Sequence, residues 1–557
     1  MDSDPVVPWW KRLFFRLAAR KPMAAILRES EQSQMHRTLG CLQLICISIG
    51  AIIGAGIFVL TGVAAAENAG PAVIVSFLIA GFVSGLSALS YSEFSTMVPI
   101  SGSAFSYTYA SMGELLAWIV GWDLTLEYVV GAATVCVSWS SYVVTFFSDA
   151  FNVQFTKKTT QAPVLWNNDR LAFEVNHGSY INIPAIFVAL MVTTLLILGI
   201  KQSAIVNQVI VAVKIVVILV FIFASIQYVD RANYSPFVPP RQNNSYGAKG
   251  VFQGVQRLLF SYIGFDAVST AAQEARNPGR NLPIAICASL CICTVLYVGV
   301  SAVLCGIAPY STLGVASPIT FALQAHPNTK WLRILTDLGA IAGLTSVILV
   351  LLLSQPRIFF AMARDGLFPR SFGRLHRRFK TPWVPTLVSG IVTAVLAGVL
   401  PVDLLGDMTS VGTLLAFILV NIGVIIMRFT HPHAYRGFRV PGGPFVIPVL
   451  GAAISLVILV LSNGPTIYRL FAWLGIGLIV YAFFGYRHSR LGNPQRWAEE
   501  DTEYFGGSGL IGDHDKEQSV SSAAHYQEPV PMPVPQHYTA YSAGGYDVPD
   551  TKSPHYH

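Results

Sequence analysis

The sequence predicts an all-α polytopic membrane protein with about twelve transmembrane helices, of which the first and the sixth are broken. Of its 557 residues, 53% are hydrophobic and only 12% are charged, whereas soluble domains carry roughly 25% charged residues. Apolar runs recur along the chain, and a run of about 20 residues is long enough to cross a bilayer. We place these runs near residues 42–63, 71–97, 115–148, 180–200, 203–227, 251–273, 283–308, 334–356, 384–402, 408–428, 444–462 and 465–486.

The first apolar run contains four glycines, at positions 50, 54, 56 and 62. Glycine costs a helix about 1 kcal/mol relative to alanine, so four of them in one span need an explanation. One explanation is close packing between helices through small residues. The other is an unwound helix, whose free N–H groups and half-helix N-terminus can hold a carboxylate at the bilayer midplane.

The sixth run is interrupted in the same way, by Gly264 and Asp266. Two broken helices at corresponding places in the two halves of a chain are the best sequence indication of a transporter binding site. The unwound helix is therefore the favoured explanation for the glycines. The sequence predicts a carrier that is organised around segments 1 and 6.

The formal net charge of +7 comes from basic residues that cluster before segment 1 and after segments 6, 8, 10 and 12. By the positive-inside rule these connections face the cytoplasm, so both termini are expected inside and the number of spans is even. This distribution favours membrane lipid over nucleic acid as the partner of the basic residues. The basic lead over residues 1–40 is expected to lie along the inner leaflet or to be disordered.

Charged residues inside apolar runs are functional candidates, because an unpaired charge is expensive there. Lys214 lies about four turns into segment 5, so it is expected either to exchange a proton during transport or to stay charged as a fixed brace in place of a bound cation. Glu127 in segment 3 and Glu93 in segment 2 are functional candidates, with Glu127 alternatively a brace between helices. Arg257 lies one turn before the break in segment 6, and it could form an outer gate with an acid, attract a substrate carboxylate or repel a cationic side chain.

Two adjacent hydroxyl residues, Thr345 and Ser346, lie in segment 8. They are expected either to face the site or to bond carbonyls of their own helix.

The sequence contains no nucleophile–base pair and no metal-ligand cluster, so we expect no enzymatic activity, no cofactor and no metal. Cys291 and Cys293 lack the spacing of a zinc site. All seven cysteines lie in or beside apolar segments, which predicts no disulfide framework.

The connections give several local expectations. Residues 99–110 carry no charge, which favours a short re-entrant or interfacial helix under the bundle. The polar loops over 149–178 and 228–250 are expected outside, and Asn233 and Asn243 begin glycosylation-type triplets. Pro283 is expected to open helix 7. The composition from about 493 onward is that of a disordered tail.

With these residues assembled, the chain resembles the amino acid–polyamine–organocation superfamily over about residues 38–490, and within it the cationic amino acid transporter branch. The motifs that carry the resemblance are Ile52-Ile53-Gly54-Ala55-Gly56-Ile57-Phe58, Pro99-x-Ser101-Gly102-Ser103, Gly121-Trp122-Asp123-Leu124-x-Leu126-Glu127-Tyr128, Tyr262-Ile263-Gly264-Phe265-Asp266-Ala267-Val268-Ser269-Thr270, Asn277-Pro278-x-Arg280-x-Leu282-Pro283 and Ala361-Met362-Ala363-Arg364-Asp365-Gly366. Each motif is weak alone, and their combination is highly specific.

The resemblance implies a LeuT-like fold of five-plus-five inverted repeats with two additional helices. It divides the chain into a cytoplasmic basic segment (1–40), a first repeat of helices 1–5 (41–227), an extracytoplasmic loop (228–250), a second repeat of helices 6–10 (251–428), helices 11–12 (429–490) and a disordered cytoplasmic tail (491–557). The substrate α-carboxylate would meet backbone N–H groups of Ala55, Gly56 and Ile57. The α-amino group would meet carbonyls of Ile52, Phe260, Ser261 and Ile263.

The function that the resemblance implies is secondary active transport of amino acids by alternating access, with a proton as the coupling ion and with arginine and lysine favoured. Lys214 matches the lysine of proton-coupled relatives, where it takes the place of a sodium ion. Two departures stand out: the chain shows twelve spans where many eukaryotic cationic transporters have fourteen, and Arg257 stands where a small or neutral residue is expected.

The alternatives are a neutral amino acid or polyamine carrier of the same fold, and a transporter-like amino acid sensor. A disulfide-linked heavy chain is not expected, because residues 149–178 contain no cysteine. The plasma membrane is favoured over the vacuolar or another internal membrane.

Overall fold

The computed structural model describes residues 16–23, 25–26, 39–100, 102–167, 172–198, 204–241, 245–376, 381–462 and 464–492. Most of the basic lead, Asn243 and the expected C-terminal tail lie outside these ranges. The described part of the chain is mostly helical, and its helices coincide with the expected apolar segments. The principal helices are α3 (Cys41–Ile52), α4 (Thr61–Ala64), α5 (Val73–Met97), α6 (Ser103–Ser111), α7 (Glu114–Phe151), α8 (Ile183–Ile197), α9 (Ala204–Ser225), α10 (Gly247–Leu258), α11 (Ala267–Thr270), α12 (Pro278–Ile307), α13 (Pro318–Gln324), α14 (Lys330–Arg364), α15 (Trp383–Val399), α16 (Val402–Thr430), α17 (Val446–Leu461), α18 (Gly464–Val480) and α19 (Tyr486–His488).

Seven helical stretches among the described residues are long and apolar enough to cross a membrane. They are Gly56–Met97, Glu114–Phe151, Gln208–Tyr228, Pro278–Ile307, Lys330–Arg364, Leu404–Thr430 and Gly464–His488. Four shorter apolar helices, α3, α8, α15 and α17, lie at other expected segments.

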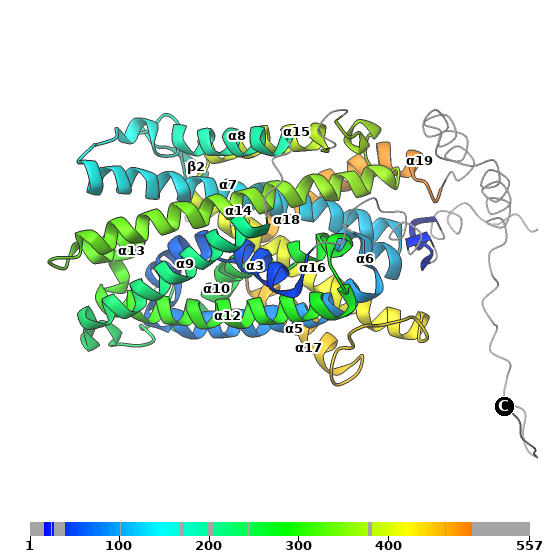
Figure 1. Ribbon diagram of the computed structural model, residues 1–557, viewed down its shortest axis with the longest axis horizontal. Coiled ribbons are helices and arrows are strands. Elements are labelled where there is room, and N and C mark those ends of the chain that lie inside the picture. The colour runs from blue at the N-terminus through cyan, green and yellow to red at the C-terminus, as the bar shows by residue number, and fades with distance from the viewer. Residues whose placement is uncertain are drawn as a thin grey trace, which may run out of the picture. The chain divides into compact units, whose positions relative to one another are not determined.

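Two long helix pairs form the frame of the bundle (Figure 1). The helices α7 and α14 run side by side along its length, and α5 packs along α12. The pair α8 and α15 covers α7. The short helix α3 contacts α9, α12 and α14, which places the first break among helices from distant parts of the sequence.

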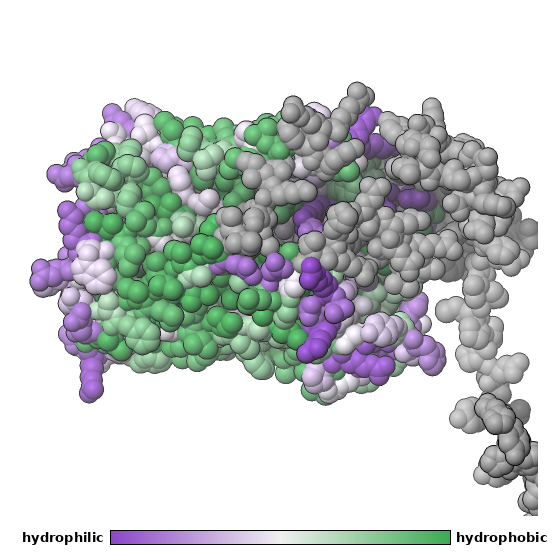
Figure 2. All heavy atoms as spheres, in the orientation of Figure 1, coloured by the Kyte–Doolittle hydropathy of each residue, from purple (hydrophilic) through white to green (hydrophobic). Residues whose placement is uncertain are grey.

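The surface of the bundle is apolar where a soluble protein would be polar. Apolar side chains cover the middle of the face in Figure 2, and polar side chains gather toward its two ends. Phe82, Phe223 and Val295 lie on three different helices, and each is more than half exposed. An exposed apolar surface of this extent is typical of contact with lipid.

The first broken helix ends at Ile52 and resumes at Gly56. Ile53 has an extended backbone, with ψ of 98°, and the chain re-enters the helix through a π-helical turn over Gly56–Leu60 that continues into α4. The sequence predicts this interruption at Gly54 and Gly56. Both glycines are tightly packed, since a methyl group at Gly54 would lie 2.9 Å from Cγ2 of Val347.

The second broken helix leaves α-helical geometry at Leu258. A 3₁₀ turn over Leu259–Tyr262 follows α10, and the short helix α11 begins at Ala267. Between them Gly264 has φ of +116°, a conformation that side chains with a Cβ rarely adopt. A Cβ at Gly264 would also lie 2.7 Å from Cβ of Ala51, so this glycine allows the two broken helices to approach each other.

Three connections can be compared with the local expectations. Residues Ser103–Ser111 form a short helix that is entirely buried, as the uncharged sequence predicts. Helix α12 begins at Pro278 rather than at Pro283, because Asn277 turns the chain with φ of 49° and Pro278 takes the first helical position. The loop after α7 forms an antiparallel hairpin of β1 (Val164–Asn167) and β2 (Ala172–Val175), which is not expected from the sequence.

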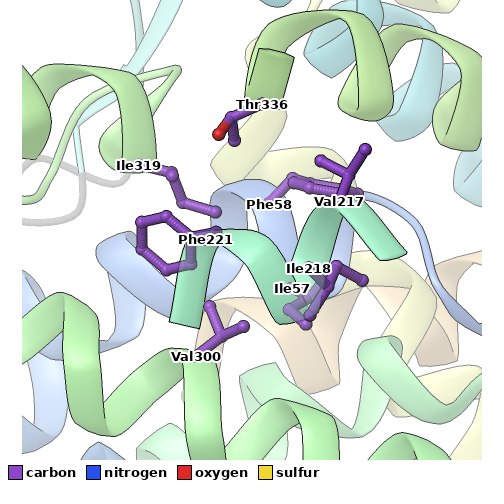
Figure 3. Close-up of a pocket in the computed structure, with 8 residues that line it drawn as sticks. All are labelled: Ile57, Phe58, Val217, Ile218, Phe221, Val300, Ile319 and Thr336. Atoms are coloured by element: carbon purple, nitrogen blue, oxygen red, sulfur yellow. The ribbon is translucent and has the colours of Figure 1, made fainter. Parts of the chain in front are cut away.

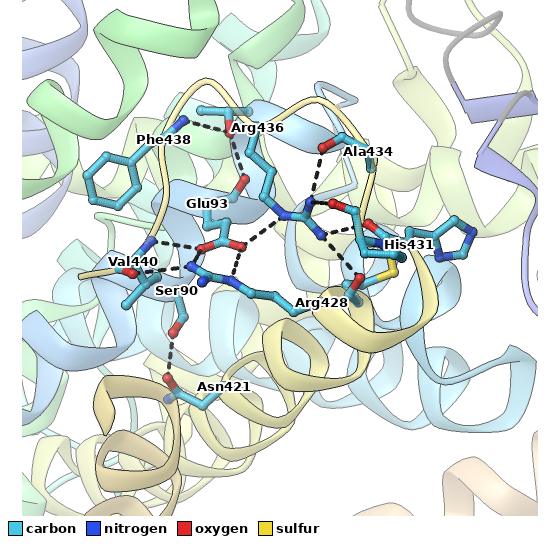
Figure 4. Close-up of polar contacts among 12 residues, drawn as sticks. Ser90, Glu93, Asn421, Arg428, His431, Ala434, Arg436, Phe438 and Val440 are labelled. Carbon is cyan, nitrogen blue, oxygen red and sulfur yellow. Dashed lines mark hydrogen bonds and ion pairs between the residues drawn. The ribbon is translucent and has the colours of Figure 1, made fainter. Parts of the chain in front are cut away.

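Glu93 ties the end of α5 to α16 and to the loop that follows α16 (Figure 4). Its carboxylate accepts bonds from Nε and Nη2 of Arg428 at 2.9 and 2.5 Å, and from Nε of Arg436 at 3.2 Å. The N–H of Val440 donates a further bond at 2.8 Å. Glu93 is only 1% exposed, so this acid is neutralised within the protein and braces three elements.

Candidate functional site

A small, tightly packed cavity lies where the two broken helices meet. Its walls come from the end of α3, the residues between α3 and α4, the turn after α10, and the facing sides of α7 and α14. The atoms around it are packed so closely that it has room for about one water molecule. The lining residues are Ala51, Ile52, Gly54, Ala55, Gly56, Val135, Phe260, Ile263, Val347 and Leu351.

The two breaks contact each other directly at Gly56 and Ser261. A methyl group on Gly56 would overlap the backbone and side chain of Ser261. The Ser261 hydroxyl is buried and has no hydrogen-bond partner. Buried polar groups are nearly always paired, so an unpaired hydroxyl beside the cavity is available to a ligand.

Backbone polarity is concentrated at the same place. The N–H groups of the first turn of a helix lack partners within that helix, and a helix restarts at Gly56 with its positive end at the cavity. The carbonyl of Phe260 accepts a bond from the N–H of Ile263 at 3.1 Å. The site therefore offers backbone donors from the first broken helix and a carbonyl oxygen from the second.

Lys214 reaches the end of α3 from α9. Its Nζ donates to the carbonyls of Gly50 at 2.9 Å and Ile53 at 3.2 Å, and to Oγ of Ser346 at 3.0 Å. These three bonds use all three donors of an ammonium group. The side chain is fully buried, and among the described residues no carboxylate forms an ion pair with it. The negative end of the α3 dipole is thus the group that stabilises its charge.

Tyr297 on α12 contacts both breaks. Its hydroxyl lies 2.8 Å from the carbonyl oxygen of Ile52 and 2.7 Å from that of Ser261. The ring is fully buried and packs on Phe77 and Tyr262, with 5.3 Å between ring centroids in each pair.

Three buried carboxylates lie on the side of the breaks toward the N-terminal end of α7. Asp123 and Glu127 are one turn apart on α7, and Asp266 follows the second break. Asp266 accepts bonds from the Tyr128 hydroxyl and from the N–H of Gly264, whereas both oxygens of Asp123 and Oε2 of Glu127 have no hydrogen-bond partner. Within the described residues none of the three carboxylates is paired with a Lys or Arg side chain. The region is therefore suited to a positive group.

Arg257 lies at the opposite side of the breaks and is only 5% exposed. Its Nη1 donates to Glu67 at 2.6 Å, while Nε and Nη2 donate to the two oxygens of Asp407 at 3.0 and 3.2 Å. Glu67 follows α4 and Asp407 belongs to α16, so the guanidinium joins both broken helices to α16. Of the three roles considered for Arg257, pairing with an acid is the one that these contacts match.

A second, apolar pocket, packed too tightly to hold a water molecule, adjoins the restarted helix (Figure 3). Side chains from α9, α12, α13 and α14 surround it together with Ile57 and Phe58. Thr336 is the polar residue among those that line it, and its hydroxyl donates to the Leu332 carbonyl of its own helix at 2.7 Å. Tyr142 holds this part of the helix, since its hydroxyl donates to the Phe58 carbonyl at 2.6 Å.

The structure brings together some of the predicted site residues and separates others. Ile52, Ala55, Gly56, Phe260 and Ile263 line the cavity. The remaining ones lie as follows: Ser261 against Gly56, Ile57 in the apolar pocket, Ser346 on Lys214, and Glu127 and Arg257 on opposite sides of the breaks.

Thr345 is directed elsewhere. Its hydroxyl donates to the Ile341 carbonyl at 2.7 Å and accepts a bond from Nε1 of Trp139 at 2.9 Å, so it joins α14 to α7. Nothing in the sequence indicates Tyr297, Val135, Val347 or Leu351, because apolar and aromatic residues within spans show no pattern that distinguishes cavity walls from ordinary packing.

Comparison with known proteins finds a matching family model and several transporters. A family model described as amino acid permease matches residues 39–484. The chain is 41% identical to the methylthioribose transporter of Bacillus subtilis (strain 168), over 85% of this chain and 99% of that protein. It is also 41% identical to a branched-chain amino acid permease of the same organism, over 84% of this chain and 97% of that protein. A vacuolar cationic amino acid transporter of Arabidopsis thaliana is 37% identical, over 75% of this chain and 64% of that protein.

These relatives are transporters and permeases, and the match spans both broken helices and most of the described helices. The apolar helices and the family together identify an integral membrane protein. The chain belongs to the amino acid permease family of the amino acid–polyamine–organocation superfamily, which includes cationic amino acid transporters.

Proposed function

We propose that this protein is a proton-coupled secondary transporter of amino acids that works by alternating access and favours arginine and lysine. The observation that carries the proposal is the meeting of two broken helices at one buried cavity, with backbone donors at Gly56 and carbonyls at Ile52 and Ser261. An α-amino acid carries a carboxylate and an ammonium group on one carbon, and this pair of backbone elements matches those two charges.

The proposed topology has twelve spans in a LeuT-like five-plus-five arrangement. The eleventh and twelfth spans, within residues 429–490, are added to the two repeats, and both termini lie in the cytoplasm. The plasma membrane is the proposed location. In this topology Arg257, Glu67 and Asp407 lie on the outer side of the cavity, and Asp123, Glu127 and Asp266 lie on the cytoplasmic side.

The preference for a cationic side chain is supported by the unpaired carboxylates. An uncompensated buried charge is costly, and a substrate guanidinium or ammonium group would supply the missing countercharge to Asp123 and Glu127. Arg257 does not oppose this preference, because Glu67 and Asp407 neutralise its charge.

Proton coupling is assigned to Lys214. When its ammonium group is protonated, it fixes the end of α3 through Gly50 and Ile53. Loss of the proton removes the charge and one donor, which weakens the contact between α9 and α3. This change would allow the half-helix before the break to move. The tight cavity is consistent with a closed conformation, because admission of a substrate requires such a movement.

A neutral amino acid is the second candidate substrate. The cavity walls at Val135, Val347 and Leu351 are aliphatic, and a relative with 41% identity is named a branched-chain amino acid permease.

The two candidates are separated by uptake of labelled arginine into proteoliposomes that contain the purified protein, with lysine, leucine, alanine, spermidine and methylthioribose as competitors. Accumulation of arginine that lysine inhibits supports the cationic assignment. Inhibition by leucine or alanine alone replaces it with the neutral one. Binding of amino acids without any uptake would favour a sensor instead of a carrier.

A further inference from the structure

Tyr297 is placed to control the geometry of the carbonyls that would receive the substrate amine. It is the residue whose single hydroxyl reaches the carbonyl of Ile52 on the first broken helix and that of Ser261 on the second, at 2.8 and 2.7 Å. These two carbonyls belong to segments more than two hundred positions apart in the sequence. Both oxygens therefore lie close to each other, on either side of one phenol oxygen.

A phenol has one hydrogen to donate, and each carbonyl has two lone pairs. The Tyr297 hydroxyl can donate to only one of the two oxygens at a time, so each carbonyl keeps acceptor capacity for a second donor. An ammonium group carries three donors, and two closely spaced carbonyls suit it. The hydroxyl thus holds the two acceptors together and leaves them able to bind an amine.

The ring of Tyr297 is itself fixed. It is fully buried between Phe77 and Tyr262. Tyr262 is a similar buried tyrosine, but its hydroxyl donates to the carbonyl of Phe77 on α5 at 3.0 Å and not to a carbonyl of either break. The chain therefore offers a matched tyrosine whose hydroxyl ties the second break to α5 and contacts neither the Ile52 nor the Ser261 carbonyl.

A second observation points to a ligand at this place. The hydroxyl of Ser261 has no hydrogen-bond partner although the residue is only 1% exposed. The same residue supplies one of the two carbonyls that Tyr297 contacts. A buried hydroxyl without a partner is costly, and a bound ligand would satisfy it.

We propose that Tyr297 is a positioning residue for the α-amino group of the substrate, setting the spacing of the Ile52 and Ser261 carbonyls. The inference rests on the proposed function and deepens it. It assigns the requirement for a free α-amine to a side chain on α12 that need not touch the substrate. Removal of the hydroxyl lets the two carbonyls separate, which weakens amine binding and leaves the carboxylate subsite at Gly56 unchanged.

The test compares Tyr297→Phe with Tyr262→Phe in proteoliposomes. Tyr297→Phe is expected to raise KM for arginine about tenfold with little change in kcat, because binding common to the ground and transition states is lost. Inhibition by 5-guanidinopentanoic acid, which is arginine without its α-amino group, is expected to stay the same. Tyr262→Phe is expected to leave both values unchanged. Elution on size exclusion and Tm check that both variants fold.

An unchanged KM in a folded Tyr297→Phe protein overturns the positioning role and leaves the proposed transport function standing. Equal weakening of arginine and of the deaminated analogue also overturns it, because that result shows a general defect. If the wild-type protein takes up neither arginine, lysine nor leucine, the proposed function and the positioning role fall together.

Discussion

The ammonium group of Lys214 lies 2.9 Å from the carbonyl oxygen of Gly50. This contact joins the middle of α9 to the last turn of α3, immediately before the first helix break. The end of that half-helix is therefore held by a charge that the loss of a single proton removes. The proposed coupling mechanism depends on this relationship.

Substitution of Lys214 separates proton exchange from a fixed brace. Lys214→Ala is expected to reduce arginine uptake at least about tenfold, because Gly50 and Ile53 lose a charged donor. Lys214→Arg keeps a positive charge but cannot release a proton in the physiological range. Proton exchange predicts that Lys214→Arg no longer accumulates arginine against a gradient, as measured by uptake at a series of external pH values.

A fixed brace predicts the opposite for the arginine variant, which would retain pH-responsive accumulation. Val213→Ala is the matched control, because the neighbouring Val213 side chain is 46% exposed on the lipid-facing surface. It is expected to behave like the wild type.

Gly56→Ala is expected to abolish uptake. A methyl group at this position overlaps Ser261, so the two broken helices have to move apart and the backbone donors lose their alignment. Gly85→Ala on α5 is the control, since a methyl group there meets nothing within 4 Å. The control is expected to retain uptake and to be more stable by about 0.4–1 kcal/mol. Wild-type uptake by Gly56→Ala would contradict the close contact of the breaks.

In the Arg257→Gln protein, the outer side of the cavity is expected to be open for a larger fraction of the time. The substitution leaves Glu67 and Asp407 without the guanidinium that joins them. A cysteine introduced by Val135→Cys reports on the accessibility of the cavity. Labelling of the native cysteines is measured in the same protein without this substitution and is subtracted. An impermeant thiol reagent is expected to label this cysteine about tenfold faster when Arg257 is replaced, equivalent to a loss of about 1.4 kcal/mol from the closed state.

The control for this measurement is Arg333→Gln, which removes an ion pair with Asp149 at 3.4 Å and should leave labelling unchanged. Equal labelling rates in the Arg257 variant and its parent would show that Arg257 does not close the outer side.

Glu93→Ala is expected to destabilise the fold by roughly 3–5 kcal/mol, because it leaves Arg428 and Arg436 without their buried countercharge. Glu274→Ala removes a more exposed pair with Arg357 at 3.1 Å, and a partly exposed pair contributes only about 0–1 kcal/mol. The measurement is Tm in detergent. A similar small decrease for both variants would show that the Glu93 cluster does not brace the fold.

The broken helices and the lysine on α9 could be predicted from the sequence because each violates a local rule. Four glycines in a span, and one charged residue in an otherwise aliphatic helix, are unusual enough to locate Gly56 and Lys214. The partners of Arg257 could not be predicted, since Glu67 and Asp407 lie 190 and 150 positions away. The role of Tyr297 could not be predicted, because tyrosine is common in apolar helices. Only the structure shows that its hydroxyl lies close to the carbonyls of Ile52 and Ser261.

The measurement that tests the account most directly is the movement of protons with arginine. Purified protein is placed in proteoliposomes that contain a pH-sensitive dye, with the membrane voltage clamped and no imposed pH gradient, and arginine is added outside. Proton-coupled transport through Lys214 predicts acidification of the lumen that depends on arginine and is absent in Lys214→Arg. Uptake of labelled arginine without any acidification in the wild type would contradict it.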